Sequence, residues 1–305
     1  MEKREFRRLV KQAESKKLTA KERAKAPGEY LDLKCGFTHY EMRDGGDDTK
    51  LPVVLVHGYS TPYFLYDPVF DALVDAGYPV IRYDLLGRGL SARVKSKYTP
   101  ELFARQLKEL VDRLLPDRTF ILFGTSMGGS IVATFCAMYP RLAQKVVLYA
   151  PAGMDTFKPP VVMKLATVPF IGKRMFRAVM PKNTLARATD ELLHRDDAVK
   201  DEFVRKLAYT MQYKGYLNGT WSSLVNTILK TKKVTKYYKT MAKQKIPTLV
   251  IWGTEDKTMP IYQLDRMAKV LKTAEFVIFE GSGHIFLYDE GDRAVAHTLP
   301  FLEEE

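Results

Sequence analysis

The chain has 305 residues, of which 46% are hydrophobic and 28% charged, the composition of a soluble globular protein long enough for one α/β domain with an insertion. Its formal net charge of +12 comes without a basic–aromatic nucleic-acid motif, so nucleic acid is not an expected partner. It has no apolar run near the ~20 residues that cross a bilayer, no apolar signal sequence after Met1 and only two cysteines, so a cytoplasmic location is expected.

Residues 1–28 are predicted to form a basic N-terminal arm. Residues 1–26 hold ten Lys/Arg and four Asp/Glu, and most of this segment is expected to be helical. Thr19 and Glu22 fit a capping box for a second short helical turn. Phe6, Leu9 and Val10 form a narrow apolar stripe in this basic background, which suits either docking on the protein body or lying on a membrane surface.

Strand and helix patterns alternate over residues 29–154. Residues 29–33 and 37–42 are predicted as an antiparallel hairpin at a sheet edge. Apolar runs predict buried strands at 51–56, 78–83, 120–123 and 146–149, with helices at 68–76, 100–115 and from residue 131 onward. Such alternation predicts an α/β fold with a mostly parallel, twisted sheet and helices on both faces.

The alternation stops at about residue 155. Residues 155–245 show no strand pattern, only helical stretches with nineteen Lys/Arg against seven Asp/Glu. Strands are predicted again at 246–252 and 275–279, and helices at 260–271 and 292–301. We therefore predict a core of residues 29–154 and 246–305, with residues 155–245 as an inserted helical cap over the carboxyl edge of the sheet, where ligands bind in open α/β folds.

The strongest chemical signal lies in residues 120–129. Four apolar residues lead into a Gly-x-Ser-x-Gly pattern centred on Ser126, and a helical pattern follows. A strand that turns so sharply into a helix strains its central residue and leaves the hydroxyl at the top of the sheet. The N-terminal N–H groups of the helix stabilise negative charge at the same place. Ser126 is therefore the candidate nucleophile.

A serine nucleophile needs a base and an orienting carboxylate. Of the five histidines, only His284 lies just beyond a predicted strand, at the sheet edge that carries Ser126. Two carboxylates, Glu255 and Asp256, follow the strand that ends at residue 252. Asp256 is favoured because it lies in the middle of its loop; Glu255 remains a rival on spacing, and Asp155 is a weaker one.

At this point the chain resembles α/β-hydrolase-fold serine hydrolases over about residues 29–153 and 246–305. The likeness rests on five motifs in order: His57-Gly58, Asp84-x-x-Gly87-x-Gly89-x-Ser91, Gly124-x-Ser126-x-Gly128-Gly129, Gly253-x-x-Asp256-x-x-x-Pro260 and Gly283-His284. It implies a triad of Ser126, Asp256 and His284. It also implies an oxyanion hole formed by the backbone N–H groups of Tyr59 and Met127, and a loop-fixing role for His57.

The resemblance implies two-step acyl transfer through an acyl-enzyme, with no metal or cofactor. Likeness to capped esterases and monoacylglycerol lipases favours a small-molecule ester with a small to medium acyl chain. A carbon–carbon bond hydrolase that acts on meta-cleavage products would share the fold and the triad, and is the alternative enzyme. A catalytically silent binding protein is the alternative of another class; such proteins usually lack a triad member.

Two features of the predicted cap bear on the substrate. Tyr213, Tyr216 and Trp221 could line a substrate pocket or only pack the cap. Residues 159–180 are apolar with interspersed lysines and arginines, which suits cap packing or a lipid-facing surface. Peripheral membrane contact through the basic arm and the cap is therefore one expectation for this chain.

Overall fold

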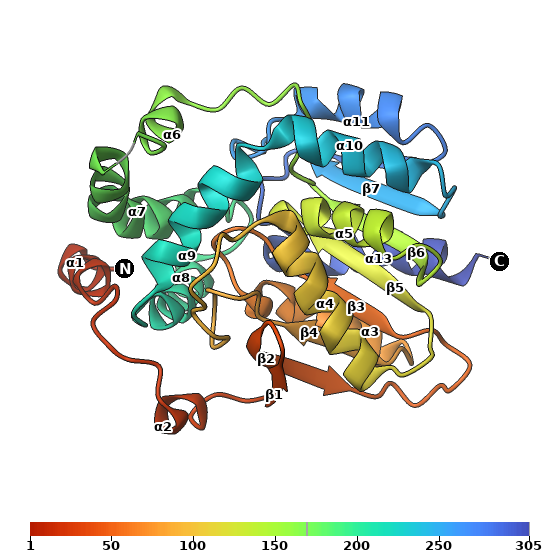
Figure 1. Cartoon of the computed structure of the whole chain (residues 1–305), viewed down its shortest axis with the longest axis horizontal. Coiled ribbons are helices and arrows are strands. Elements are labelled where there is room, and N and C mark those ends of the chain that lie inside the picture. Colours follow the sequence, from red (N-terminus) through yellow and green to blue (C-terminus); the bar gives the residue numbers. More distant parts are fainter. Residues whose placement is uncertain (169, 305) are drawn as a thin grey trace.

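The computed structural model describes residues 1–168 and 170–304, and these contain one eight-stranded sheet (Figure 1). The strand order is β1-β2-β4-β3-β5-β6-β7-β8. The antiparallel hairpin β1–β2 pairs with β4 at one side of the sheet. The six strands β4, β3, β5, β6, β7 and β8 run parallel to one another. The predicted mostly parallel sheet is confirmed. The strands are β1 (Glu29–Leu33), β2 (Gly36–Arg43), β3 (Val53–Val56), β4 (Val80–Tyr83), β5 (Phe120–Thr125), β6 (Ala143–Tyr149), β7 (Thr248–Gly253) and β8 (Glu275–Phe279).

Helices cover both faces of this sheet (Figure 1). The helices α3 (Asp67–Asp75), α12 (Phe286–Asp289) and α13 (Gly291–Glu303) pack together, and α4 (Pro100–Leu114), α5 (Met127–Met138), α10 (Thr231–Ala242) and α11 (Leu264–Val270) form a second layer. Central strands therefore have no solvent-facing side, which is why every residue of β3, β5 and β7 is buried and their sequences are almost wholly apolar.

The segment between β6 and β7 is helical in its described residues. It holds α6 (Val161–Leu165), α7 (Ile171–Asp190), α8 (Asp197–Met211), α9 (Tyr216–Ser223), a π-helical turn (Leu224–Ile228) and α10. The helices α6 to α9 lie beyond one end of the sheet, whereas α10 packs along α5 (Figure 1). The predicted cap of residues 155–245 is therefore too long at its C-terminal end, because α10 helps to cover the sheet face.

The N-terminal arm packs on these cap helices. Its helices are α1 (Lys3–Lys11) and α2 (Ala20–Arg23), so the expected helix is interrupted at residues 12–19. Within the interruption, the Glu14 carboxylate accepts the N–H groups of Gly215 (2.8 Å) and Leu217 (2.9 Å) at the start of α9, which ties the arm to the cap. The apolar stripe of α1 contacts the core between α7 and α8, and Thr19 accepts the N–H of Glu22 as the capping pattern predicts.

A buried polar cluster fixes the loop after β4. Asp84 accepts hydrogen bonds from His39 Nδ1 (2.8 Å) and the Leu90 N–H (2.8 Å). His39 also donates through Nε2 to the Pro27 carbonyl (2.8 Å), so both ring nitrogens carry protons. Nearby, His57 Nε2 accepts the Leu85 N–H at 2.9 Å, and burial lowers the pKa of His57 to about 4. These contacts give His57 a neutral, loop-fixing position, as the sequence led us to expect.

None of the described helices is long and apolar enough to cross a bilayer.

Candidate active site

Ser126 lies at a strained turn between β5 and α5. Its backbone adopts φ +52° and ψ −119°, a conformation that side-chain-bearing residues rarely take. The turn is held tightly against β3: a Cβ atom added at Gly128 would lie 2.0 Å from the carbonyl oxygen of Val56. Only glycine fits there, which explains the second glycine of the motif. The strained serine-centred elbow that the sequence predicts is present.

His284 and Asp256 meet on the loops after β8 and β7. His284 Nδ1 donates to Asp256 Oδ2 at 2.6 Å, and Asp256 Oδ1 accepts the N–H groups of Thr258 (2.8 Å) and Met259 (2.6 Å). The carboxylate is therefore fixed by three donors and is itself buried. Of its rivals, Glu255 is exposed, and Asp155 forms a surface ion pair with Arg266 at 2.8 Å.

Ser126 and His284 line the same cavity, which has a volume of about 500 Å³. The two side chains are not hydrogen-bonded to each other, whereas His284 and Asp256 are. Because His284 Nδ1 is held by Asp256, its Nε2 is the nitrogen left to accept a proton from a hydroxyl. Catalytic hydrogen bonds are often long without substrate and shorten only in the reacting complex.

The backbone N–H groups of Tyr59 and Met127 are free to bind an anion. Neither donates to any other residue that the structure describes. Tyr59 is fixed on both sides: its hydroxyl donates to the Thr220 carbonyl (2.9 Å), and its carbonyl accepts Arg88 Nε (2.7 Å). Glycine at position 58 relieves a close approach to the serine, since a Cβ there would lie 3.2 Å from Ser126 Cβ, a tight contact. This geometry suits an oxyanion site.

Glu191, which the sequence interpretation missed, connects the cap to the loops that carry Asp256 and His284. It ends α7 and is almost fully buried. Its Oε2 accepts the backbone N–H of His284 (2.8 Å), and its Oε1 accepts the Thr258 hydroxyl (2.8 Å). No motif marks this residue, because its partners lie 67 and 93 positions away along the chain. Only the fold brings them together.

The charges around His284 favour its protonated form. Burial alone would lower the pKa of this imidazole, but the charge and hydrogen bond of Asp256, with the charge of Glu191, raise it above its usual value. If His284 acts as a base, it must be neutral, so activity should be lost as the pH falls below this raised pKa.

Glu191→Gln should move the acid limb of the kcat/KM profile to lower pH. The amide keeps an acceptor for the His284 N–H but removes a negative charge that raises the imidazole pKa. The measurement is kcat/KM against pH for a soluble ester, with Glu255→Gln as the matched control, since Glu255 is an exposed carboxylate that does not line the cavity. An unchanged limb in E191Q, or an equal shift in E255Q, would contradict this role.

The cavity wall is mostly apolar and comes largely from the cap. Its apolar side chains are Leu65, Pro160, Met163, Ala166, Phe176, Val179, Met180, Ala186, Ala188, Leu207, Leu224, Ile228, Met259 and Ile285. Arg187, Asp190 and Glu191 supply the charged groups on the cap side. Such a wall suits an uncharged, flexible chain better than a strongly polar substrate.

The three candidate pocket residues do not line this cavity among the described residues. Tyr213 is buried under the arm and donates to Glu22 at 3.1 Å, and Tyr216 is buried in the core between α7 and α8. Trp221 donates to the Ala166 carbonyl at 2.8 Å. That pocket prediction was wrong: these three aromatic residues pack the cap, and aliphatic residues, methionines and Phe176 form the wall.

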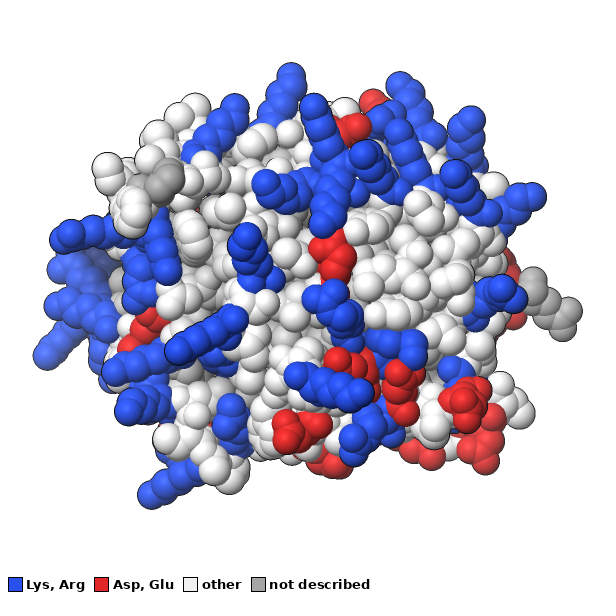
Figure 2. All heavy atoms as spheres, in the orientation of Figure 1, with Lys and Arg blue, Asp and Glu red and all other residues white. Residues whose placement is uncertain are grey.

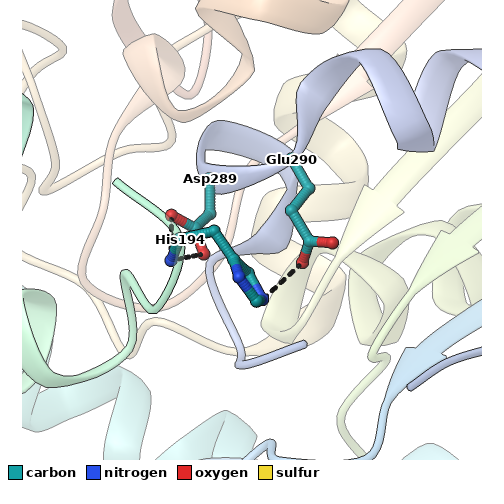
Figure 3. A group of neighbouring side chains, drawn as sticks. All are labelled: His194, Asp289 and Glu290. Atoms are coloured by element: carbon teal, nitrogen blue, oxygen red, sulfur yellow. Dashed lines mark hydrogen bonds and ion pairs between the residues drawn. The ribbon is translucent and has the colours of Figure 1, made fainter. Parts of the chain in front are cut away.

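A second cluster of ligand-type side chains lies at the junction of cap and core: His194, Asp289 and Glu290 (Figure 3). Most of its polar atoms already have partners, although Glu290 Oε2, 3.6 Å from His194 Nε2, accepts no hydrogen bond from the described residues. Asp289 accepts the N–H groups of Leu193 (2.9 Å) and His194 (3.0 Å), and Glu290 pairs with Arg293 (2.8 Å). His194 Nε2 bonds the Gly281 carbonyl at 3.1 Å, which places a proton on the nitrogen that would bind a metal. The cluster therefore anchors the cap to α12.

Comparisons with known proteins agree with this architecture. A family model described as alpha/beta hydrolase fold matches residues 52–291. The chain is 27% identical over 270 residues to the 2-hydroxy-6-oxononadienedioate/2-hydroxy-6-oxononatrienedioate hydrolase of Escherichia coli strain K12, covering 87% of this chain and 90% of that protein. An esterase from Exiguobacterium antarcticum superposes with a TM-score of 0.74 at 19% identity (91% and 100% of the two chains). A bromoperoxidase from Bacillus anthracis gives 0.73 at 22% (90% and 100%).

Proposed function

Because the chain belongs to the alpha/beta hydrolase family, we propose that it is a serine hydrolase that cleaves carboxylic esters, with Ser126, His284 and Asp256 as its catalytic triad. The single observation that carries this proposal is the arrangement at one cavity. A strained serine and a histidine held by a buried carboxylate face the same space.

In the proposed mechanism, His284 Nε2 takes the hydroxyl proton as Ser126 Oγ attacks the ester carbonyl. Asp256 keeps the other proton on Nδ1 and stabilises the imidazolium that forms. The N–H groups of Tyr59 and Met127 bind the oxyanion. His284 then protonates the leaving alcohol. A water molecule, deprotonated by the same imidazole, releases the acid from the acyl-enzyme.

The proposed acyl group is a small to medium aliphatic chain, including that of a monoacylglycerol-like ester. The apolar cap side chains supply the wall against which such a chain would lie. The cavity of about 500 Å³ is in the range of small-molecule sites, so it limits the acyl length that fits.

A second candidate is hydrolysis of a carbon–carbon bond. One relative, at 27% identity, carries the name of a dienedioate hydrolase. A dienedioate bears two carboxylates, for which cations in the pocket would be needed. Among the described cavity residues, Arg187 is the single Lys or Arg, so ester hydrolysis is our preferred reading.

A panel of 4-nitrophenyl esters of increasing acyl length tests the proposal. We expect turnover with a clear optimum at small to medium chains, because longer chains exceed the cavity. Labelling of Ser126 by a fluorophosphonate probe reports on the nucleophile independently of the substrate. Labelling without ester turnover would favour the carbon–carbon hydrolase, and absence of labelling would favour a binding protein without activity.

A further inference from the structure

We propose that the tip of the cap, together with helix α1, docks on an anionic phospholipid membrane and that the catalytic cavity opens beside this surface. The docking surface consists of the described residues of the cap segment 161–168 and 170–179 and the exposed side of α1. The docking proposal is argued from the surface residues alone. The proposal that a membrane ester reaches Ser126 also rests on the proposed function.

The cap tip exposes an unusual number of large apolar side chains. Phe170 is 95% exposed, Val161 69% and Ile171 66%. Four more belong to the same segment: Leu165, Val168, Met175 and Val179. Of the twelve large apolar side chains that are exposed among the described residues, these seven lie within nineteen positions of the chain. A concentration of this kind marks an interaction surface and not ordinary surface scatter.

The charge around this tip is mostly positive, although Glu14 of the arm is paired with Arg177. Residues 156–189 contain seven Lys/Arg and no Asp or Glu. Helix α1 adds five more cations, Lys3, Arg4, Arg7, Arg8 and Lys11, against the single carboxylate of Glu5. Glu5 is already paired with Arg205 at 2.9 Å. In Figure 2 these basic side chains gather at the end of the molecule where Figure 1 places α1 and α7.

The arm is held so that its cations face outward beside the tip. The apolar residues Phe6, Leu9 and Val10 are turned inward against α7 and α8, and the cations of α1 are exposed. Apolar side chains flanked by cations match a leaflet of anionic lipids: the first enter the acyl boundary, and the second bind headgroup phosphates.

The docking surface continues into the catalytic cavity. Val179 is 44% exposed and also lines the cavity, and Met163 and Phe176 of the same segment form its wall. A lipid that enters between these side chains would stay in apolar contact on its way toward Ser126. The membrane is thus the expected source of substrate for this site.

Sedimentation with sucrose-loaded vesicles tests the docking. The protein would carry Ser126→Ala, so that no lipid is consumed. We expect binding to phosphatidylcholine vesicles that contain phosphatidylglycerol to be about tenfold stronger than to phosphatidylcholine alone, and to weaken as salt rises. Phe170→Asp should reduce binding about tenfold, as should the pair Lys3→Glu and Arg7→Glu.

Matched controls lie away from the docking surface. Ile278→Asp changes an exposed apolar residue on the edge strand β8. The pair Lys269→Glu and Lys272→Glu makes the same charge change at the end of α11, which leads into the amino end of β8. Both should leave binding unchanged. Absence of binding to the anionic vesicles, or equal losses in the controls, would overturn the proposal.

Two further measurements separate the remaining outcomes. Light scattering of the wild type should show no self-association. Self-association that Phe170→Asp abolishes would mean that a second copy covers the tip, and would overturn membrane docking. Turnover of soluble 4-nitrophenyl butyrate without vesicles should be the same in wild type and Phe170→Asp, since Phe170 does not line the cavity. Vesicle binding with no ester turnover would contradict the proposed function and leave the docking proposal supported.

Discussion

Ser126→Ala should lower kcat for the best nitrophenyl ester by about 10⁶-fold and abolish fluorophosphonate labelling. Among the hydroxyl side chains that the structure describes at the cavity, that of Ser126 lies at the strained turn and faces the space that His284 also lines. The residual rate would come from the oxyanion N–H groups and from substrate binding. KM should change little, since the substituted side chain keeps its Cβ.

Ser130→Ala is the matched control for this substitution. Ser130 lies on the same helix, is equally buried, and donates to the Ala152 carbonyl at 2.8 Å away from the cavity. It should lose some stability but keep its activity. Hydrolysis undiminished in S126A, with the melting temperature confirming a folded protein, would disprove the nucleophile assignment.

Asp256→Asn should lower kcat by about 10⁴-fold. An amide at this position can present its oxygen either to His284 or to the N–H groups of Thr258 and Met259, but not to all of them. With the oxygen facing the backbone, the imidazole loses its acceptor at Nδ1 and its base tautomer is no longer held. The measurement is kcat at a pH above the raised pKa of His284.

Glu255→Gln decides between the two carboxylates that the sequence left open. Glu255 is exposed and precedes Asp256 directly, so the variant makes the same chemical change one residue away. We expect near-wild-type kcat in E255Q. A large loss there and a small one in D256N would reverse the assignment.

Strand ends and loop motifs could be read from the sequence because their signals are local. Buried parallel strands are apolar on both faces, and a serine between glycines at a strand end forces one particular turn. In the sequence, position in the loop alone favoured Asp256 over Glu255. In the structure the Asp256 carboxylate accepts two N–H groups of its own loop, which a residue at that position can reach.

Long-range packing in the cap could not be predicted in this way. Helical spacing of Tyr213, Tyr216 and Trp221 is the same whether a face lines a cavity or packs on a neighbouring helix. The role of Glu191 depends on contacts with loops at residues 258 and 284, which no short motif records. For the N-terminal arm, the sequence allows either packing on the protein body or contact with a membrane. In the structure its apolar stripe packs on the cap, and its basic side faces outward.

Because Glu191 bonds to the loops at residues 258 and 284, the inserted cap cannot be exchanged for that of a relative without affecting the core. A carboxylate supplied by the cap completes the loop on which His284 lies, so a chimera that takes its cap from a relative would need an acceptor at the same point in space. Without one, the N–H of residue 284 would be left buried and unpaired. Specificity and catalytic competence would then have to evolve together in this protein, because the same helix end serves both.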